Sequence, residues 1–468
     1  MNKIVKNIKE ALNLCGIKDG MTISFHHHLR NGDNVINMTV NALQELGIKN
    51  LNLCASSLFQ VHSPIISAFD DETITTVESG YIGGDVGVAI SNGKLKNKAV
   101  FRSHGHRPSD IKSGKIHIDV AVIAAPTSDD MGNCSGKFGK SACGSLGYAM
   151  ADAQYADKVI VVTDNLVSYP LCDFSIPETQ VDYVVCVDSI GDPEGIVSST
   201  TKITRDPAGL RIAKFAVDCI KNSGLLKNGF SFQTGAGGAS LAAAMYLKEI
   251  MLKENIKGSF CMGGITGYIV DMLEAGCFET LFDVQCFDLR AVESLKNNSR
   301  HKEVSAEHYA SPTSKSCIAD KLDVVILGAT EIDTDFNVNV HTNSQGIIMG
   351  GSGGHSDVAA GSKLSIIVAP LIRARLPVIV DRVNCISTPG KTVDILVTQR
   401  GIAVNPAKKD LAERLKASGL PVFDIKALKN IAEDFSGKPE PVERGNKIIA
   451  EVLYRDGTVI DEIMNYCG

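Results

Sequence analysis

The 468-residue sequence lacks the features of a nucleic-acid-binding or membrane protein. It has no excess of basic charge, because its formal net charge is −6 and its pI is about 6.0, so no nucleic-acid partner is expected. No apolar run reaches about 18 residues, which argues against a membrane span. The N-terminus has no long apolar core, so we do not expect it to be a signal peptide.

A disulfide or zinc framework is also missing. The thirteen cysteines include no C-x-x-C pair, and their odd number and wide scatter argue against both frameworks. Cys186, Cys261 and Cys286 fall in apolar, strand-like runs, which is typical of buried, reduced thiols. We therefore expect a cytoplasmic protein without a bound metal.

The glycine-rich turns do not have the spacing of nucleotide loops. The richest stretch, IIMGGSGGHSDVAAGSK (347–363), has neither the G-K-[ST] ending of a P-loop nor a G-x-G-x-x-G pattern. QTGAGG (233–238) has the wrong spacing as well. Ser141, Cys143 and Ser145 could include a nucleophile, but no G-x-S-x-G elbow supports a serine hydrolase.

The apolar segments that are present favour an α/β fold. Short β-branched runs, typical of strands buried on both faces, occur at 119–125, 158–164, 183–188, 323–329, 364–370 and 376–381. Helical patterns, such as 239–251, lie between many of these runs. This alternation predicts a parallel α/β architecture.

The chain also resembles itself at a spacing of about 200 residues, which indicates a duplicated domain. Residues 19–33 match 227–240, and residues 118–133 match 322–337. The stretch KSACGSLGYAMAD (140–152) can be laid on the glycine-rich stretch 347–363. We predict two similar halves, 1–210 and 211–468, with the boundary in or just after 198–214. The charged tail from about Lys408 is expected to be a helical extension of the second half.

Three adjacent histidines follow a predicted strand. On an extended backbone His26 and His28 share one face and His27 lies on the other. A metal site would need further ligands that the sequence does not supply nearby. The imidazoles could instead bind carboxylates together with Arg30 and Asn31, or they could simply pack in the turn.

Three other polar residues are candidates with two interpretations each. His355 and Asp357 could form a base with its orienting carboxylate, or Asp357 could cap the helix that follows. Glu331 comes just after a predicted strand, where α/β sheets place ligands, but it could also be an ordinary loop carboxylate.

Six long motifs point to one family. They are SFHHHLRNGD (24–33), HIDVAVIAAPTSDDMGN (117–133), SACGSLGYAMADAQYADKVIVVTDN (141–165), VDYVVCVDSIGDPEGIVS (181–198), GFSFQTGAGGASLA (229–242) and GGSGGHSDVAAGSKL (350–364). Together they resemble the α subunit of bacterial, ATP-independent citrate lyase, from about Lys18 to the C-terminus. The resemblance implies an α/β fold of two tandem, similar, open parallel-sheet domains of the CoA-transferase (NagB/RpiA-like) type.

The resemblance also implies a reaction and partners. Citrate and an acetyl-[acyl-carrier protein] would give citryl-[acyl-carrier protein] and acetate. A β subunit would then cleave the citryl thioester, and the γ subunit would be the carrier, with a prosthetic group derived from dephospho-CoA. No cofactor would be bound tightly by this chain, and a homo-oligomer is expected. A CoA-transferase acting on free acyl-CoA and another carboxylic acid, or a non-catalytic assembly subunit, remain alternatives.

One departure from the CoA-transferases concerns the mechanism. Many of them carry a catalytic glutamate in an S-E-N-G-like turn, but the corresponding turn here, 260–267, has Cys261 and Met262 and no carboxylate. This favours direct transfer through a mixed anhydride, in which the protein aligns the reactants and stabilises oxyanions.

The resemblance and the motifs together assign candidate residues. The catalytic group, with a glycine loop as oxyanion cradle, is Gly351, Ser352, Gly353, Gly354, His355, Asp357 and Glu331. The slot for the thioester and its pantetheine arm is Thr234, Gly235, Gly237, Gly238, Met262, Gly263 and Gly264. The citrate-binding group is His26, His27, His28, Arg30 and Asn31.

Overall fold

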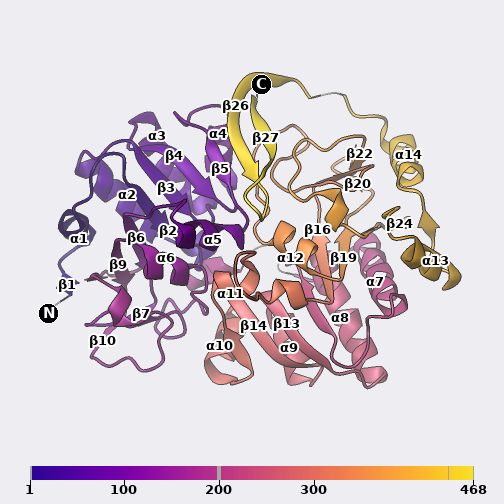
Figure 1. Cartoon of the computed structure of the whole chain (residues 1–468), viewed down its shortest axis with the longest axis horizontal. Helices are drawn as coiled ribbons and strands as arrows, with labels where there is room; N and C mark the ends of the chain where they lie inside the picture. Colours follow the sequence, from indigo (N-terminus) through magenta and orange to yellow (C-terminus); the bar gives the residue numbers. More distant parts are fainter. Residues whose placement is uncertain (1–2, 198–201, 441, 467–468) are drawn as a thin grey trace.

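Two large, mainly parallel sheets lie side by side, each with helices packed around it (Figure 1). The computed structural model describes residues 3–197, 202–440 and 442–466. Part of the predicted boundary, residues 198–201, lies outside the described residues. We call residues 3–197 the first half and residues 202–440 the second half. The predicted α/β fold with parallel sheets is confirmed.

The first sheet has ten strands, all parallel to their neighbours except the last pair. Across the sheet they are β1 (Ile4–Val5), β11 (Tyr183–Cys186), β9 (Lys158–Thr163), β6 (Val120–Ala124), β2 (Thr22–Phe25), β3 (Leu51–Ala55), β4 (Ile74–Ser79), β5 (Ala99–Phe101), β26 (Arg444–Leu453) and β27 (Val459–Tyr466). Helices of this half are α1 (Ile8–Cys15), α2 (Val35–Glu45), α3 (Ser67–Asp70), α4 (Gly84–Ser91), α5 (His106–Ser113) and α6 (Ala149–Tyr155).

The second sheet has nine strands and is parallel except between β23 and β24. In order they are β15 (His301–Glu303), β14 (Phe278–Cys286), β13 (Gly258–Ile265), β12 (Ser231–Thr234), β16 (Val324–Gly328), β19 (Leu364–Val368), β23 (Ile395–Val397), β24 (Ile402–Val404) and β25 (Val422–Phe423). Its helices include α7 (Pro207–Asn222), α8 (Gly238–Lys253), α9 (Gly267–Glu274), α10 (Leu289–Asn297), α11 (Ala306–Ala310), α12 (His355–Gly361), α13 (Lys409–Ala417) and α14 (Ile425–Ser436).

Local sequence signals explain where the second half begins. The Asp206 carboxylate accepts a hydrogen bond from the Gly209 amide at 3.1 Å and caps α7. Pro207 occupies the first turn, where its missing N–H costs nothing and its fixed φ suits a helix. Ile212, Ala216 and other apolar residues at helical spacing are buried, which anchors α7 on the second sheet.

Each half carries a small three-stranded sheet in the same place. The first is β10 (Leu166–Val167), β7 (Thr127–Asp129) and β8 (Cys134–Ser135), and the second is β22 (Ile379–Val380), β17 (Glu331–Asp333) and β18 (Val338–Asn339). In both, the aspartate that ends the middle strand accepts from an asparagine amide four residues on: Asp129 from Asn133 at 3.0 Å, Asp333 from Asn337 at 2.9 Å. The self-similarity of the sequence therefore corresponds to repeated structure here.

One predicted strand is wrong. The run 376–381 does not enter a large sheet but gives the short strands β21 (Leu376–Pro377), which pairs with β20 (Ile372–Arg373), and β22. Its apolar residues resemble a buried strand, but Pro377 cannot donate to a ladder, which suits an edge position. The sequence of 374–384 resembles that of 156–165, but the structural counterpart of β9 is β19, because each lies next to the strand that precedes its small sheet.

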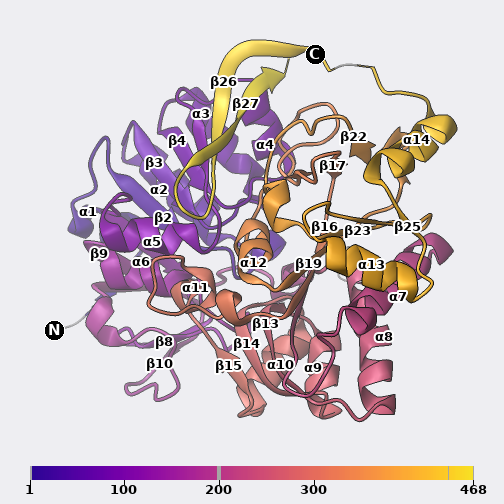
Figure 2. The same ribbon diagram turned by 45° about the vertical axis from the view of Figure 1, so that its right-hand side comes forward.

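The tail also differs from its prediction. Helices α13 and α14 do extend the second half, but β26 and β27 form an antiparallel hairpin, with β26 parallel to β5 of the first sheet. Figure 2 shows that this hairpin packs against the first half, although its neighbours there lie far away in the sequence. A charged tail contains no local signal for a partner strand that lies more than 300 residues away, at Ala99–Phe101.

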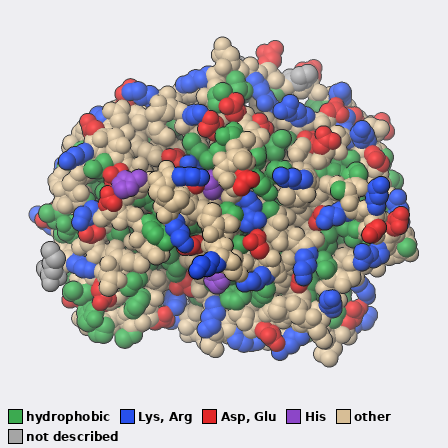
Figure 3. Space-filling view, viewed as in Figure 1, with side chains coloured by type: hydrophobic (Ala, Val, Ile, Leu, Met, Phe, Trp, Pro, Cys, Tyr) green, Lys and Arg blue, Asp and Glu red, His purple; other side chains and the backbone are tan. Residues whose placement is uncertain are grey.

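The surface and the thiols complete the description. Basic and acidic side chains alternate over the face in Figure 3, without a large patch of one sign. The described cysteines are all free and most are buried, but Cys186 is exposed, contrary to its prediction. Among the described residues, no helix has both the length and the apolar character needed to cross a membrane.

Candidate active site between the two halves

The three adjacent histidines are buried at the carboxyl end of β2. His26 and His28 contact each other through their Nδ1 atoms, as expected for residues on one face. His27 Nδ1 lies 2.6 Å from Ser56 Oγ, and the Ala124 amide donates to His26 Nε2 at 2.9 Å. The cluster is therefore fixed by neighbouring strands of the first sheet.

The imidazoles are neutral. Burial lowers the pKa of His26 to about 4 and the pKa of His104, which stacks on His27, to about 3. Burial and then the neighbouring imidazoles lower the pKa of His27 and His28. These rings can thus exchange neutral hydrogen bonds with a ligand, but they do not supply the positive charge that charge-assisted binding of carboxylates requires.

Arg30 supplies that charge. It has a φ of 52° at the start of the 3₁₀ turn η1 (Arg30–Gly32), and its guanidinium carbon lies 5.5 Å from the Phe59 ring centroid and 4.7 Å from the Phe287 ring centroid. Burial lowers its pKa, and its Nη1 atom has no partner among the described residues. A buried guanidinium with a free donor is suited to a carboxylate. Asn31, in contrast, is exposed.

Tyr148 is a further member of the cluster, which the sequence did not indicate. Its ring centroid lies 4.7 Å from that of His27 and 4.4 Å from that of His104. Its amide donates to His28 Nε2 at 3.3 Å. Burial raises the pKa of Tyr148 well above its ordinary value, so the phenol keeps its proton.

The second half contributes two polar side chains to the same place. Gln233, at the end of β12, donates through Nε2 to Tyr309 Oη at 3.2 Å, while its Oε1 atom has no partner in the described part of the chain. Gln285, on β14, donates to the carbonyl oxygen of His27 at 2.9 Å. The edge of the second sheet is thus bonded directly to the histidine cluster.

Two predicted glycines connect Gln233 to Arg30. A Cβ at Gly263, where φ is +104°, would lie 2.8 Å from Gln233 Nε2, and a Cβ at Gly264 would lie 2.2 Å from the Phe287 ring that faces Arg30. Only glycine lets this strand approach so closely. Gly263 therefore packs against Gln233, and Gly264 packs against Phe287, whose ring in turn faces Arg30.

The predicted glycine loop closes the other side. A Cβ at Gly354 would lie 2.4 Å from Tyr309 Oη, and one at Gly353 would lie 3.2 Å from His104 Nε2. The Gly353 amide donates to the Gly80 carbonyl at 3.0 Å, and the Gly353 carbonyl accepts from the His104 amide at 2.8 Å. The loop is thus held between the halves, with His104 on one side and Tyr309 on the other.

These hydrogen bonds reduce the number of backbone amides that could form the predicted oxyanion cradle. The Gly353 amide is already used by Gly80, so it is not free for a ligand. The amides of Gly351, Ser352 and Gly354 donate to no acceptor within residues 3–197, 202–440 and 442–466. Three of the four proposed backbone donors therefore remain candidates.

The predicted pair of His355 and Asp357 does not form. His355 Nε2 donates to the Gly328 carbonyl at 2.9 Å, and its Nδ1 lies 2.7 Å from Thr388 Oγ1. Asp357 instead accepts from Ser103 Oγ at 2.8 Å. Nor does Asp357 cap α12, whose N-cap is Gly354 without a side-chain hydrogen bond.

Asp357 joins the two halves instead. It also accepts from the Gly105 amide at 2.9 Å, so both of its oxygens bind the first half, and its burial raises its pKa to about 6. Sequence spacing could not reveal this role, because residues 103–105 are more than 250 positions away.

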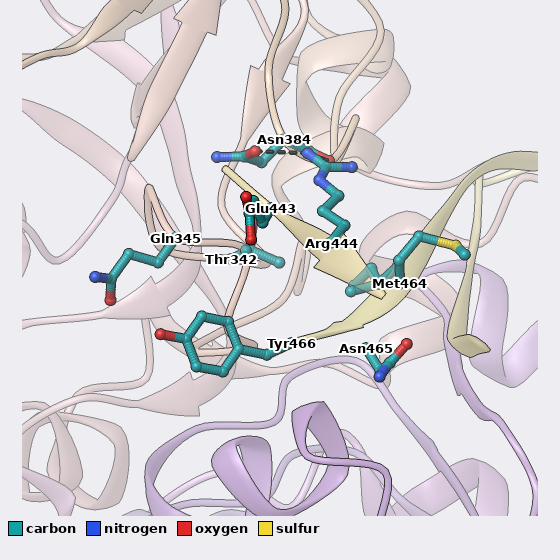
Figure 4. A pocket seen from close by; sticks show the side chains of 10 residues that line it. Thr342, Gln345, Asn384, Glu443, Arg444, Met464, Asn465 and Tyr466 are labelled. Atoms are coloured by element: carbon teal, nitrogen blue, oxygen red, sulfur yellow. Dashed lines mark hydrogen bonds between the residues drawn. The ribbon is translucent and has the colours of Figure 1, made fainter. Parts of the chain in front are cut away.

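Glu331 lies on β17, away from the imidazole cluster's contacts. It is buried and accepts from Asn339 Nδ2 at 3.0 Å and from Asn384 Nδ2 at 3.2 Å. Asn384 is in turn bound by Arg444 of the C-terminal hairpin, at 2.5 Å (Figure 4). Glu331 lines a cavity of about 530 Å³ together with Asn384. The interpretation as an exposed loop carboxylate is wrong, whereas a catalytic role stays a prediction.

The remaining predicted slot residues divide into two groups. Gly235 and Gly237 precede α8, and a Cβ at either would meet nothing closer than 3.7 Å, so this turn leaves room beside the backbone. Thr234 is bonded to the Ser240 carbonyl, and the Gly238 carbonyl accepts from Thr204, so both stabilise the turn. Met262 packs in the core, with only 2% of its surface exposed, and its side chain is not available to a ligand.

Comparison with known proteins places this geometry in a class. The structure superposes on a malonate decarboxylase α subunit from Acinetobacter baumannii with a TM-score of 0.69 and 16% identity, covering 93% of each chain. At that identity the likeness shows the fold alone: the chain is an α/β protein of the CoA-transferase-like class.

Closer relatives identify the family. The model of the citrate lyase alpha subunit family (CitF) matches residues 1–466. The citrate lyase alpha chain of Haemophilus influenzae is 48% identical over 461 residues, which cover 98% of this chain and 92% of that one. A crystal structure of the citrate lyase α subunit from Streptococcus mutans in complex with citrate has 47% identity and a TM-score of 0.98, covering 100% of this chain and 92% of that one. The chain belongs to the citrate lyase α-subunit family, which confirms the resemblance.

Proposed function

We propose that the chain exchanges acetyl for citryl on the thiol of an acyl carrier protein: citrate and acetyl-carrier give citryl-carrier and acetate. Membership of the citrate lyase α family and the citrate in the complex of the Streptococcus mutans relative support this reaction. The observation that carries it is that two buried polar atoms, Arg30 Nη1 and Gln233 Oε1, have no partner among the described residues.

The direct route needs no protein nucleophile. A citrate carboxylate oxygen attacks the acetyl carbonyl carbon, the carbon–sulfur bond breaks, and the carrier leaves as a thiolate. The thiolate then attacks the citryl carbonyl of the mixed anhydride, the anhydride carbon–oxygen bond breaks, and acetate leaves. No proton is gained or lost overall, so neutral imidazoles suffice as hydrogen-bond partners.

Two tetrahedral oxyanions form along this route and need donors. The free amides of Gly351, Ser352 and Gly354 are the candidates, because glycine lets backbone N–H groups approach an acyl carbon. Loss of one such donor typically costs about 3 kcal/mol of barrier. The neighbouring Tyr309, whose pKa is raised by burial, keeps a hydroxyl proton that can add a further hydrogen bond.

The carrier's arm would enter beside the α8 turn. Gly235 and Gly237 leave space there, whereas Met262 is closed off in the core. The arm, derived from dephospho-CoA, would belong to the γ subunit and not to this chain, and a β subunit would consume the citryl-carrier. We further propose that the chain acts in the cytoplasm as a homo-oligomer within this complex.

Transfer by the purified chain tests the function. Mixed with acetylated carrier protein, the chain should release acetate and form citryl-carrier with citrate, and much more slowly with propionate or succinate. Equal use of free acetyl-CoA and any of these acids would indicate a general CoA-transferase. Persistence of the reaction without the chain would leave it only an assembly role and refute the proposal.

A trapping experiment separates the two chemical routes. Borohydride or hydroxylamine is added during turnover with acetyl-carrier and citrate, and the protein is searched by mass spectrometry for a modified carboxylate. Direct transfer predicts no modified side chain. Modification of Glu331, or of any other acidic residue in proportion to turnover, would replace direct transfer by a protein-bound thioester.

A further inference from the structure

The free oxygen of Gln233 requires a hydrogen-bond donor. The side chain is nine-tenths buried, its nitrogen is bound to Tyr309 Oη, and Gly263 packs directly against its amide. Its Oε1 atom has no partner in the described chain. A buried acceptor without a donor is costly, so a ligand that donates at this point gains affinity, whereas one that cannot donate leaves the cost in place.

Arg30, in contrast, favours a ligand atom that accepts a hydrogen bond. Arg30 Nη1 is a donor and suits a carboxylate oxygen. An ionised carboxylate has only acceptor oxygens, so it cannot satisfy Gln233 and would be repelled by it. Acetate and the carboxylates of citrate therefore fit Arg30 and not Gln233. Citrate has one donor at neutral pH, its hydroxyl group.

We infer that Gln233 is the residue that recognises the hydroxyl of a hydroxytricarboxylate, while Arg30 binds one of its carboxylates. The inference rests on the proposed function, and it adds the group that separates citrate from the same tricarboxylate without a hydroxyl. A short series of contacts connects the acceptor to the cation, from Gln233 through Gly263, Gly264 and the Phe287 ring to Arg30.

Calorimetric titration of the full chain with citrate and with tricarballylate, which lacks only the hydroxyl, tests this inference. The wild-type chain should bind citrate on the order of 10- to 100-fold more tightly, because tricarballylate leaves the acceptor unpaired. In Gln233→Met, which keeps the length of the side chain and removes its acceptor, the citrate affinity should fall to roughly that of tricarballylate.

Gln285→Met is the matched control. Gln285 is also a buried glutamine beside the cluster, but its amide binds the His27 carbonyl. Its replacement should weaken both acids by the same factor and leave their ratio unchanged. If Gln233→Met fails to fold, as judged by its melting temperature, the wild-type ratio alone decides the question.

The other outcomes each refute something specific. Equal affinity of the wild-type chain for the two acids overturns the role of Gln233 but not the transferase function. The role of Gln233 is also overturned if Gln233→Met binds both acids as tightly as the wild-type chain does but has a raised KM for acetyl-carrier. In that case the acceptor would bind an amide of the carrier's arm. A wild-type chain that binds neither acid and transfers nothing overturns the proposed function itself.

Discussion

The two halves share a fold but place different chemistry at equivalent positions. In strand register Ser24 of β2 corresponds to Gln233 of β12, so the first half has a serine where the second half has the glutamine. At the N-cap of α6 the first half has Tyr148, whereas the N-cap of α12 is Gly354. The first half therefore supplies the imidazoles and the charge of Arg30, whereas the second half supplies the glycine loop, two glutamines and the rings of Phe287 and Tyr309.

The difference follows from how the halves meet. Gly354 must be small because Tyr309 lies 2.4 Å from the position of its missing Cβ, whereas Tyr148 fills the corresponding space of the first half with a ring stacked on His27. A symmetric pair of rings would leave no room for a ligand. Divergence of the two copies has thus produced a site that neither half could form alone.

Removal of the Arg30 guanidinium should have the largest effect. Arg30→Met should lower kcat/KM for citrate on the order of 10³-fold, because a carboxylate would lose its charged partner in a buried site. Steady-state transfer to citrate measures this. Arg211→Met is the control, since Arg211 also stacks on a phenylalanine but is exposed on α7. A change of less than about threefold in Arg30→Met would exclude its role in binding.

Acid should destabilise both halves through buried histidines. The pKa of His26 in one half and of His355 in the other is lowered to about 4, so the folded chain binds fewer protons than the unfolded chain below pH 6.5. Stability is fully present above pH 6.5 and is lost as the pH falls toward 4, by about 2 kcal/mol per histidine at pH 5. Denaturant unfolding at pH 7 and pH 5 measures the loss.

A single variant sharpens that measurement. His355→Gln should reduce the difference in the free energy of unfolding between pH 7 and pH 5 by about 2 kcal/mol, whatever it does to stability at pH 7. Equal pH dependence in the variant and in the wild-type chain would show that His355 is not held neutral by its burial.

Adding a side chain at Gly354 should have a moderate effect on the transfer reaction. Gly354→Ala forces its Cβ onto Tyr309 Oη, and kcat/KM should fall roughly 10- to 100-fold. In combination with Tyr309→Phe the loss should be smaller than the sum of the two single losses, because the hydroxyl in the way is gone. Gly328→Ala, where a Cβ meets nothing within 4 Å, is the control. Strict additivity would contradict the contact.

The smallest effect is expected at Glu331, whose place in the first half is taken by Thr127. Glu331→Gln keeps acceptors for Asn339 and Asn384, and direct transfer does not use the carboxylate, so the transfer rate should change by less than about threefold. A loss on the order of 10³-fold with unchanged stability would instead make Glu331 a nucleophile or base.

The sequence predicts the fold where signals are local. Buried β-branched runs predict β6, β9, β16 and β19, and the repeat predicts two similar halves. It fails at 376–381, where a short apolar run lies outside both large sheets, and at the C-terminal hairpin, whose partner strand is distant in the chain.

The site divides in the same way. Histidines and glycines are visible as clusters, so the walls of the site are predicted. Gln233 opens the predicted QTGAGG turn, but the repeat sets it opposite Ser24, so the sequence assigns it no role. Tyr309 and Phe287 carry no local signal, since they reach the site only through the packing of the halves. For the same reason His355 and Asp357, which lie two positions apart, bind different partners.

The C-terminal hairpin has a consequence for how the chain is made. Strand β26 covers β5, so the first sheet stays open along β5 until residues 444–453 have been synthesised, more than 300 residues after β5. During synthesis that unpaired edge can pair with another strand, including one from a neighbouring nascent chain. A segment made long after β5 therefore completes the first half, and a chain that stops before residue 444 would keep β5 as an exposed, aggregation-prone edge strand.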